Sequence, residues 1–265
     1  MEYVFYLCLG AFSGLISGLF GLGGGSIIVP LLIFAFASQG IDAQIATHLA
    51  IGTSLATIAI TSLSSIYTHH QKRAIRWDLV SQLTPGMIIG SVLGGVFAIS
   101  LNGFLLQLMF GGFMVVVGLQ MLIFRTVAQE GVMPSPGVLA AVGSGVGSIS
   151  ALFGIGGGTL TAPFLAHSGV RMHQAIGTAA ACGLPIGIVA TLVYSASDLA
   201  GEALPGASLG YVFLPAWIGI VVTSAPFARM GALLAHRIND KLLKRAFGWV
   251  VLLLGIRFIW INIHF

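Results

Sequence analysis

Apolar runs of about 20 residues, separated by short polar breaks, recur along this chain from one end to the other. Runs of this length cross a bilayer as helices, because only a helix satisfies all of its backbone hydrogen bonds within one segment. The pattern therefore predicts membrane-crossing helices at about 45–67, 79–99, 103–124, 172–195, 208–228 and 241–263.

Two further apolar stretches, residues 4–37 and 137–167, are interrupted by glycine-rich breaks. Three adjacent glycines cannot hold a helix, because each costs about 1 kcal/mol relative to alanine and frees backbone groups that need partners. The arm after the first break, residues 26–37, is too short to cross a bilayer alone. We therefore expect both stretches to be broken helices.

The two breaks are copies of one motif. Gly-Leu-Gly-Gly-Gly-Ser-Ile-Ile-Val-Pro at residues 21–30 returns as Gly-Ile-Gly-Gly-Gly-Thr-Leu-Thr-Ala-Pro at residues 154–163, and 11 of 19 positions are identical between 14–32 and 147–165. A fixed offset over such a length indicates an internal repeat. We expect a first repeat at 1–128 and a second at 137–265, joined by a proline-containing linker at 129–136.

Composition supports an integral membrane protein, because 57% of the residues are hydrophobic, 7% are charged and the mean hydropathy is +1.03. The basic residues then report topology. If the broken stretches cross the membrane, the basic loops fall on both sides. If each stretch is a re-entrant hairpin, ten of the eleven Lys and Arg residues share one side, as the positive-inside rule requires.

The preferred fold class is therefore an all-α integral membrane protein of two inverted repeats. Each repeat is a re-entrant broken-helix hairpin followed by three transmembrane helices, and both termini lie outside. The basic linkers then mark the cytoplasmic side of a multi-pass membrane protein.

The breaks also predict a binding site. Two helix N-termini that meet at the bilayer midplane present free N–H donors and about half a positive charge each, which suits an anion. The candidate residues are Gly23, Gly24, Gly25, Ser26, Gly156, Gly157, Gly158 and Thr159. The alternative is that the glycines only allow close helix packing while the hydroxyls bond to backbone.

A second motif, His-Leu-Ala-Ile-Gly-Thr-Ser at residues 48–54, returns at residues 173–179 with alanine in its last place. Thr53, Ser54 and Thr178 either bond a nearby carbonyl or line a polar cavity. His48 and His173 either gate transport and carry a proton or anchor the helix ends.

Arg257 lies inside the last span and either contacts an anion or extends its side chain to the interface. No Asp or Glu falls inside a predicted span, which argues against a cation substrate. We expect no catalytic residue, no cofactor, no metal and no nucleic-acid partner. The expected partners are a small anion and the bilayer, with a homodimer as a candidate assembly.

The repeated motifs resemble the TauE/SafE family of sulfite-exporter-like permeases, in which each half has a Gly-x-Gly-Gly-Gly motif ending in proline and then an Ala-x-Gly-Thr-Ser motif. Here these are residues 21–30 and 50–54, then 154–163 and 175–179, where Ala179 replaces the serine. The resemblance covers the whole chain. It implies secondary transport, usually export, of sulfite, a sulfonate or a related sulfur-containing anion across a bacterial inner membrane.

Two other classes stay open at this stage. An intramembrane enzyme is one, although the chain has no Gly-x-Ser-Gly sequence, no His-Glu-x-x-His sequence and no intramembrane aspartate pair. A membrane sensor or scaffold without transport activity is the other.

Overall fold

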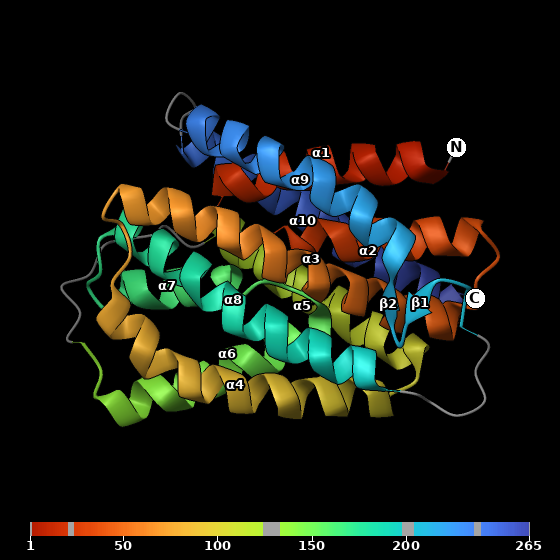
Figure 1. Cartoon of the computed structure of the whole chain (residues 1–265), viewed down its shortest axis with the longest axis horizontal. Helices are drawn as coiled ribbons and strands as arrows, with labels where there is room; N and C mark the ends of the chain where they lie inside the picture. Colours follow the sequence, from red (N-terminus) through yellow and green to blue (C-terminus); the bar gives the residue numbers. More distant parts are fainter. Residues whose placement is uncertain (1, 21–23, 124–132, 198–203, 236–239, 265) are drawn as a thin grey trace.

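The computed structural model of the chain describes residues 2–20, 24–123, 133–197, 204–235 and 240–264. These residues form helices and one short β-hairpin (Figure 1). The elements are α1 (Glu2–Phe20), α2 (Gly25–Ser38), α3 (Ala43–Gln71), α4 (Trp77–Ser100), α5 (Gly103–Ile123), α6 (Pro136–Phe153), α7 (Gly158–His167), α8 (Met172–Ala196), β1 (Ser208–Leu209), β2 (Val212–Phe213), α9 (Leu214–Ala235) and α10 (Asp240–His264).

Five helices in the described part of the chain are long and apolar enough to cross a membrane, namely α3, α4, α5, α6 and α8. In contrast, α2 has 14 residues and α7 has 10, so neither reaches across a bilayer core about 30 Å thick. The all-helical membrane class expected from the sequence is confirmed.

Both glycine motifs interrupt the helices. The first helix ends at Phe20 and the next begins at Gly25, while α6 ends at Phe153 and α7 begins at Gly158. Gly24 and Gly154 adopt left-handed backbone angles, with φ of 68° and 66°, which glycine tolerates far better than other residues. These two residues turn the chain where a continuous helix would have run straight.

The first broken segment folds back on itself (Figure 1). The side-chain amide of Gln39, just after α2, donates to the Tyr6 hydroxyl near the start of α1, with an N–O distance of 2.8 Å. The end of α2 therefore lies beside the start of α1, and the chain enters and leaves this hairpin at one end of the molecule.

Helix pairing is the same when the two halves are exchanged. The first helix of the chain, α1, packs along α9, and its repeat equivalent α6 packs along α4. The equivalent helices α3 and α8 pack on each other, as do α5 and α10. Each broken segment is thus held by a helix of the other half, so the two halves interlock.

Glycines bring the paired helices close together. Gly86, Gly90 and Gly94 follow one another at one-turn intervals on α4, and each faces a backbone carbonyl of α6. A Cβ at Gly90 would overlap the carbonyl oxygen of Ser144. On α1, Gly14 is equally close to the backbone of α9. Small residues of this kind let membrane helices approach at short range.

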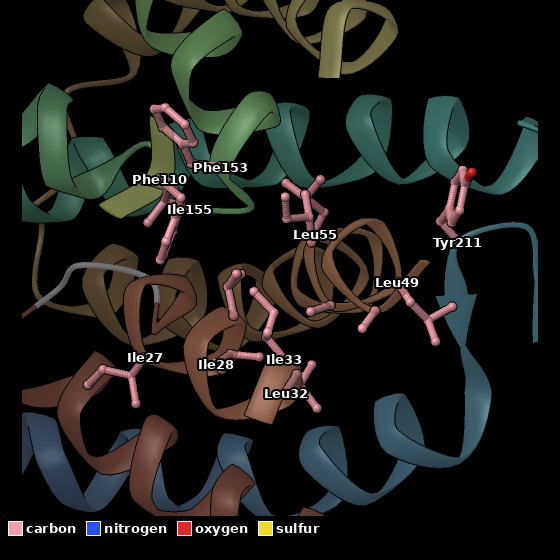
Figure 2. Close-up of a cluster of buried hydrophobic side chains, with 14 of the residues drawn as sticks. Ile27, Ile28, Leu32, Ile33, Leu49, Leu55, Phe110, Phe153, Ile155 and Tyr211 are labelled. Atoms are coloured by element: carbon pink, nitrogen blue, oxygen red, sulfur yellow. The ribbon is translucent and has the colours of Figure 1, made fainter. Parts of the chain in front are cut away.

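The core gathers around α2 (Figure 2). Ile27, Ile28 and Leu32 are at most 2% exposed, and they pack with side chains of α3, α5 and the second break. Among these, Phe153 makes an edge-to-face contact with Phe110, with ring centroids 5.9 Å apart. The first six residues of α2 are therefore buried in protein, which places the N-terminus of this helix away from lipid.

One predicted span is wrong at its start. Residues 208–213, expected at the beginning of the span 208–228, form the hairpin β1–β2, and α9 begins only at Leu214. Left-handed angles at Ala207 and Gly210 turn the chain there, and the Tyr211 N–H donates to the carbonyl of Tyr194. A short apolar run does not distinguish strand from helix by its periodicity.

The linker 129–136 lies largely outside the described residues. The division into repeats at 1–128 and 137–265 stays a prediction.

Candidate functional site

The two helix breaks meet inside the molecule. A Cβ at Gly25, the first residue of α2, would overlap the carbonyl oxygen of Gly154 and lie 2.9 Å from the Cα of Ile155. The Ser54 hydroxyl of α3 donates to the same Gly154 carbonyl over 2.8 Å. The structure thus brings Gly25 and Ser54 to the second break, whereas Gly24 lies against Ser13 and Ser17 of α1. Gly23 lies outside the described residues.

Ser26 and Thr159 are the second residues of the two short helices and occupy equivalent repeat positions. Their exposed fractions are 3% and 9%, yet neither hydroxyl has a hydrogen-bond partner. Neither residue caps its helix. Buried hydroxyls are nearly always paired, so two unpaired ones at equivalent helix starts indicate a place where a ligand or water binds. The first N–H groups of each helix also lack intrahelical acceptors.

A small cavity of about 20 Å³, open on one side, lies beside the second break. It is lined by Ser17, Thr61, Ser62, Ser65, Gly156, Gly158, Ala179, Ala180 and Gly183. Two of the predicted glycines are therefore on its wall, with Gly157 between them in sequence. In the conformation described, this volume holds about one water molecule.

Four hydroxyl residues of this cavity were not predicted as site residues. Ser17 could have been found, because it is identical to Ser150 at the repeat offset. Thr61, Ser62 and Ser65 stand in a span rich in hydroxyl residues, where sequence alone does not show which face meets the break. Ala179, the replacement for serine in the second copy of the motif, also lines the cavity.

The hydroxyls of Thr53 and Thr178 accept hydrogen bonds from backbone N–H groups, and neither residue lines the cavity. The Thr53 hydroxyl accepts from the N–H of Phe213 over 3.0 Å, and the Thr178 hydroxyl accepts from the N–H of Arg76 over 3.0 Å. Phe213 and Arg76 directly precede α9 and α4. Each threonine thus fixes the start of a helix in the opposite half. This differs from both interpretations given to these hydroxyls, because the partner is a backbone N–H more than 100 residues away.

The remaining candidates lie apart from the cavity. His48 is 4% exposed and rests on the ring of Tyr211, with centroids 5.1 Å apart. His173 is exposed at the start of α8. Arg257 is exposed and lies over the ring of Phe34 on α2, 5.7 Å from its centroid. The structure does not bring these three residues together with Ser26 and Thr159.

Charge is confined to the periphery of the described part. None of the Lys, Arg, Asp and Glu side chains whose burial is described is buried, and Arg76 forms an exposed ion pair with Asp78. The region of the breaks offers N–H and O–H donors without a fixed countercharge. Such a region stabilises an anion through oriented dipoles in a water-poor interior.

Comparison with known proteins identifies the family. Residues 6–258 match the family model described as Sulfite exporter TauE/SafE. A Probable membrane transporter protein of Haemophilus influenzae is 32% identical over 94% of this chain and 96% of its own length. Proteins described in the same words from Xylella fastidiosa and Methanocaldococcus jannaschii are 28% and 27% identical, over 95% and 92% of this chain and 92% of their own lengths.

No solved structure matches the chain. The family match runs from the second turn of α1 to residue 258 within α10, and both copies of the glycine motif fall inside it. The matches to the Haemophilus and Xylella proteins, both described as probable membrane transporters, cover 96% and 92% of those proteins. The chain therefore belongs to the sulfite exporter TauE/SafE family and is a multi-pass membrane transporter rather than an enzyme.

Proposed function

We propose that this protein is a secondary transporter that exports a small sulfur-containing oxyanion, such as sulfite or a sulfonate, bound between the starts of α2 and α7. One observation carries the proposal. The hydroxyls of Ser26 and Thr159 are buried, unpaired and placed in the first turns of two short helices at equivalent repeat positions. The family description supports the sulfur oxyanion and the direction of transport.

The chemistry of the site favours this class of substrate. An oxyanion accepts several hydrogen bonds at once, and each charge-assisted bond contributes about 1.5 to 3 kcal/mol. Two helix N-termini add about half a positive charge each. A cation would leave the same donors unpaired in a dry interior. The site therefore selects by charge and by the number of acceptor atoms.

The membrane arrangement in the proposal is an inverted repeat with two re-entrant hairpins. Two features support it. The α3–α4 connection, with Lys72 and Arg73, lies at the same end of the molecule as the α7–α8 connection, with Arg171 (Figure 1). The chain also enters and leaves the first hairpin at the opposite end. The positive-inside rule then assigns the basic end to the cytoplasm.

Flux into proteoliposomes tests the proposal. Purified protein is reconstituted, and uptake of radiolabelled sulfite is measured against empty liposomes and against competition by a sulfonate, a small amine and a neutral polyol. We expect uptake of sulfite that the sulfonate inhibits and that the amine and polyol leave unchanged. Uptake of the amine, or the absence of protein-dependent uptake of both sulfur anions, would overturn the proposed function.

A further inference from the structure

His48 is the one histidine that is buried among those whose burial the structure describes. It lies in the second turn of α3, and both of its ring nitrogens face backbone carbonyls. Nδ1 is 2.9 Å from the oxygen of Gln44, and Nε2 is 3.1 Å from the oxygen of Ala98 on α4. These contacts join the first turns of α3 to the last turn of α4.

The chemistry of these contacts depends on a proton. A carbonyl oxygen accepts hydrogen bonds and cannot donate, so each ring nitrogen needs its own N–H. A neutral imidazole has one N–H, and its other nitrogen would then point a lone pair at a buried carbonyl oxygen. The imidazolium has two and satisfies both contacts. Both contacts can therefore be hydrogen bonds at the same time only in the protonated ring.

The surroundings also suit a cation. Ala98 belongs to the last turn of α4, where the helix dipole presents partial negative charge. The ring of Tyr211 lies beside the imidazole, with an interplanar angle of 33°. Aromatic faces attract cations at such distances.

Few other ionisable groups share this region among the described residues. Tyr194 of α8 packs against Tyr211, and Asp42 precedes α3, where its carboxylate accepts from the N–H of Gln44. The sequences of α2, α5 and α6, which also pack on α3, contain no ionisable residue. The one acid of α4, Asp78, stands at the opposite end of that helix.

The remaining ionisable residues of α8 and α9 lie elsewhere. His173 is exposed in the first turn of α8, Cys182 is buried in the second hydrophobic cluster, and Arg229 is exposed in the second half of α9.

We propose that His48 is a proton-binding site of the transporter, and that the bound proton holds the start of α3, the end of α4 and the Tyr211 segment together. When the ring loses one proton, one nitrogen faces a carbonyl without a hydrogen, and the contact to Gln44 or to Ala98 is lost. Because Ala98 belongs to another helix, proton release loosens α4 from α3. The conformation described here is the proton-bound one.

Solid-state NMR of the full chain in lipid vesicles tests the proton site directly. Protein labelled with ¹⁵N-histidine and with ¹³C-carbonyl alanine and glutamine reports the protonation of each ring nitrogen and the dipolar contacts of His48 to Gln44 and Ala98. We expect both contacts only in rings with both nitrogens protonated, and we expect one of the two contacts to disappear together with the second N–H as the pH rises. A neutral ring that keeps both carbonyl contacts overturns the proposal.

The contact to Ala98 identifies the NMR signal of the His48 ring in the wild-type protein. The assignment of this signal therefore does not depend on whether a variant folds. His48→Gln, where it folds, removes that signal. His173→Gln is the matched control, because His173 is the exposed equivalent in the other repeat, and it should leave the signal unchanged. Loss of the signal in His173→Gln, with the signal kept in His48→Gln, contradicts the assignment.

The consequence for transport rests on the proposed function and is measured separately. We expect anion flux in proteoliposomes to vary severalfold with pH in the wild type and in His173→Gln, and to lose this dependence in His48→Gln. Unchanged pH dependence in an active His48→Gln protein overturns the role in transport. Absence of flux in the wild type counts against the proposed function, while the NMR result stands independently.

Discussion

Individual hydroxyl residues fall into two groups that the sequence does not separate. Ser26, Thr53, Thr159 and Thr178 were all predicted site residues. The structure gives Thr53 and Thr178 backbone partners from the opposite half, whereas Ser26 and Thr159 are buried and have none. Motif position selected these four residues, but the partners of Thr53 and Thr178 come from segments more than 100 residues away, so only tertiary packing reveals them.

Removing a paired hydroxyl should lower stability. Thr53→Val leaves the buried N–H of Phe213 without an acceptor, so we expect a loss of about 1 to 3 kcal/mol in the free energy of unfolding. Ser26→Ala removes an unpaired hydroxyl and should change the stability of the ligand-free protein by less than about 0.5 kcal/mol. Denaturant unfolding in detergent measures both. Equal losses would show that Ser26 has a partner.

Gly25 is predicted to contribute to stability as well as to ligand access. An added Cβ would overlap the Gly154 carbonyl, so Gly25→Ala should separate the two breaks and destabilise the protein by about 1 to 3 kcal/mol. Gly112→Ala on α5 is the control, because nothing lies within 4 Å of its Cβ position. A Gly25→Ala protein as stable as Gly112→Ala would contradict the observed contact between the breaks.

At the scale of helices, the sequence predicted the breaks well and the β-hairpin not at all. Adjacent glycines carry a large backbone cost wherever they occur, so their effect is local and can be predicted from sequence. The strands β1 and β2 depend on Tyr194 and Thr53, whose contacts arise only when α3, α8 and α9 assemble. An apolar run such as 208–228 carries no sign of those contacts.

Glycines line the contact between α4 and α6, so an added methyl group there should lower the stability of the protein. Gly90→Ala places a methyl group against the Ser144 carbonyl, so the helices must separate, and we expect a loss of about 1 to 3 kcal/mol. Gly145→Ala, on an open face of α6, should be neutral or stabilising, since alanine is the better helix former. Thermal unfolding of both variants in one detergent compares them. Equal melting temperatures would mean that the helices do not approach as closely as described.

For the whole molecule, the sequence predicted a repeat but not how its copies combine. The offset between the motifs shows two similar halves, yet α1 packs on α9 and α6 packs on α4, across the halves. Nothing in the spacing of apolar residues indicates which helices exchange partners. The inverted arrangement in the membrane was inferred from the basic residues and stays a proposal.

Thiol labelling tests that arrangement. In a protein without Cys8 and Cys182, a cysteine at Ser38, at the end of α2, should react from outside the cell with an impermeant reagent. A cysteine at Gln71, at the end of α3 beside the basic loop, should not. Ala203, a second residue expected to be outside, lies beyond the described residues. External labelling at Gln71 with protection at Ser38 would contradict the inverted arrangement.

Calorimetric titration of the purified transporter with sulfite or a sulfonate tests the central claim most directly. If the two helix starts bind the anion, Ser26→Ala and Thr159→Val should each weaken binding by about 1 kcal/mol, a factor of about 5 in Kd, and the double variant should lose more. Ser91→Ala, which removes another buried unpaired hydroxyl in the middle of α4, serves as the control and should bind normally. Unchanged anion affinity in the double variant, or binding of a cationic amine in place of the anion, would contradict the account.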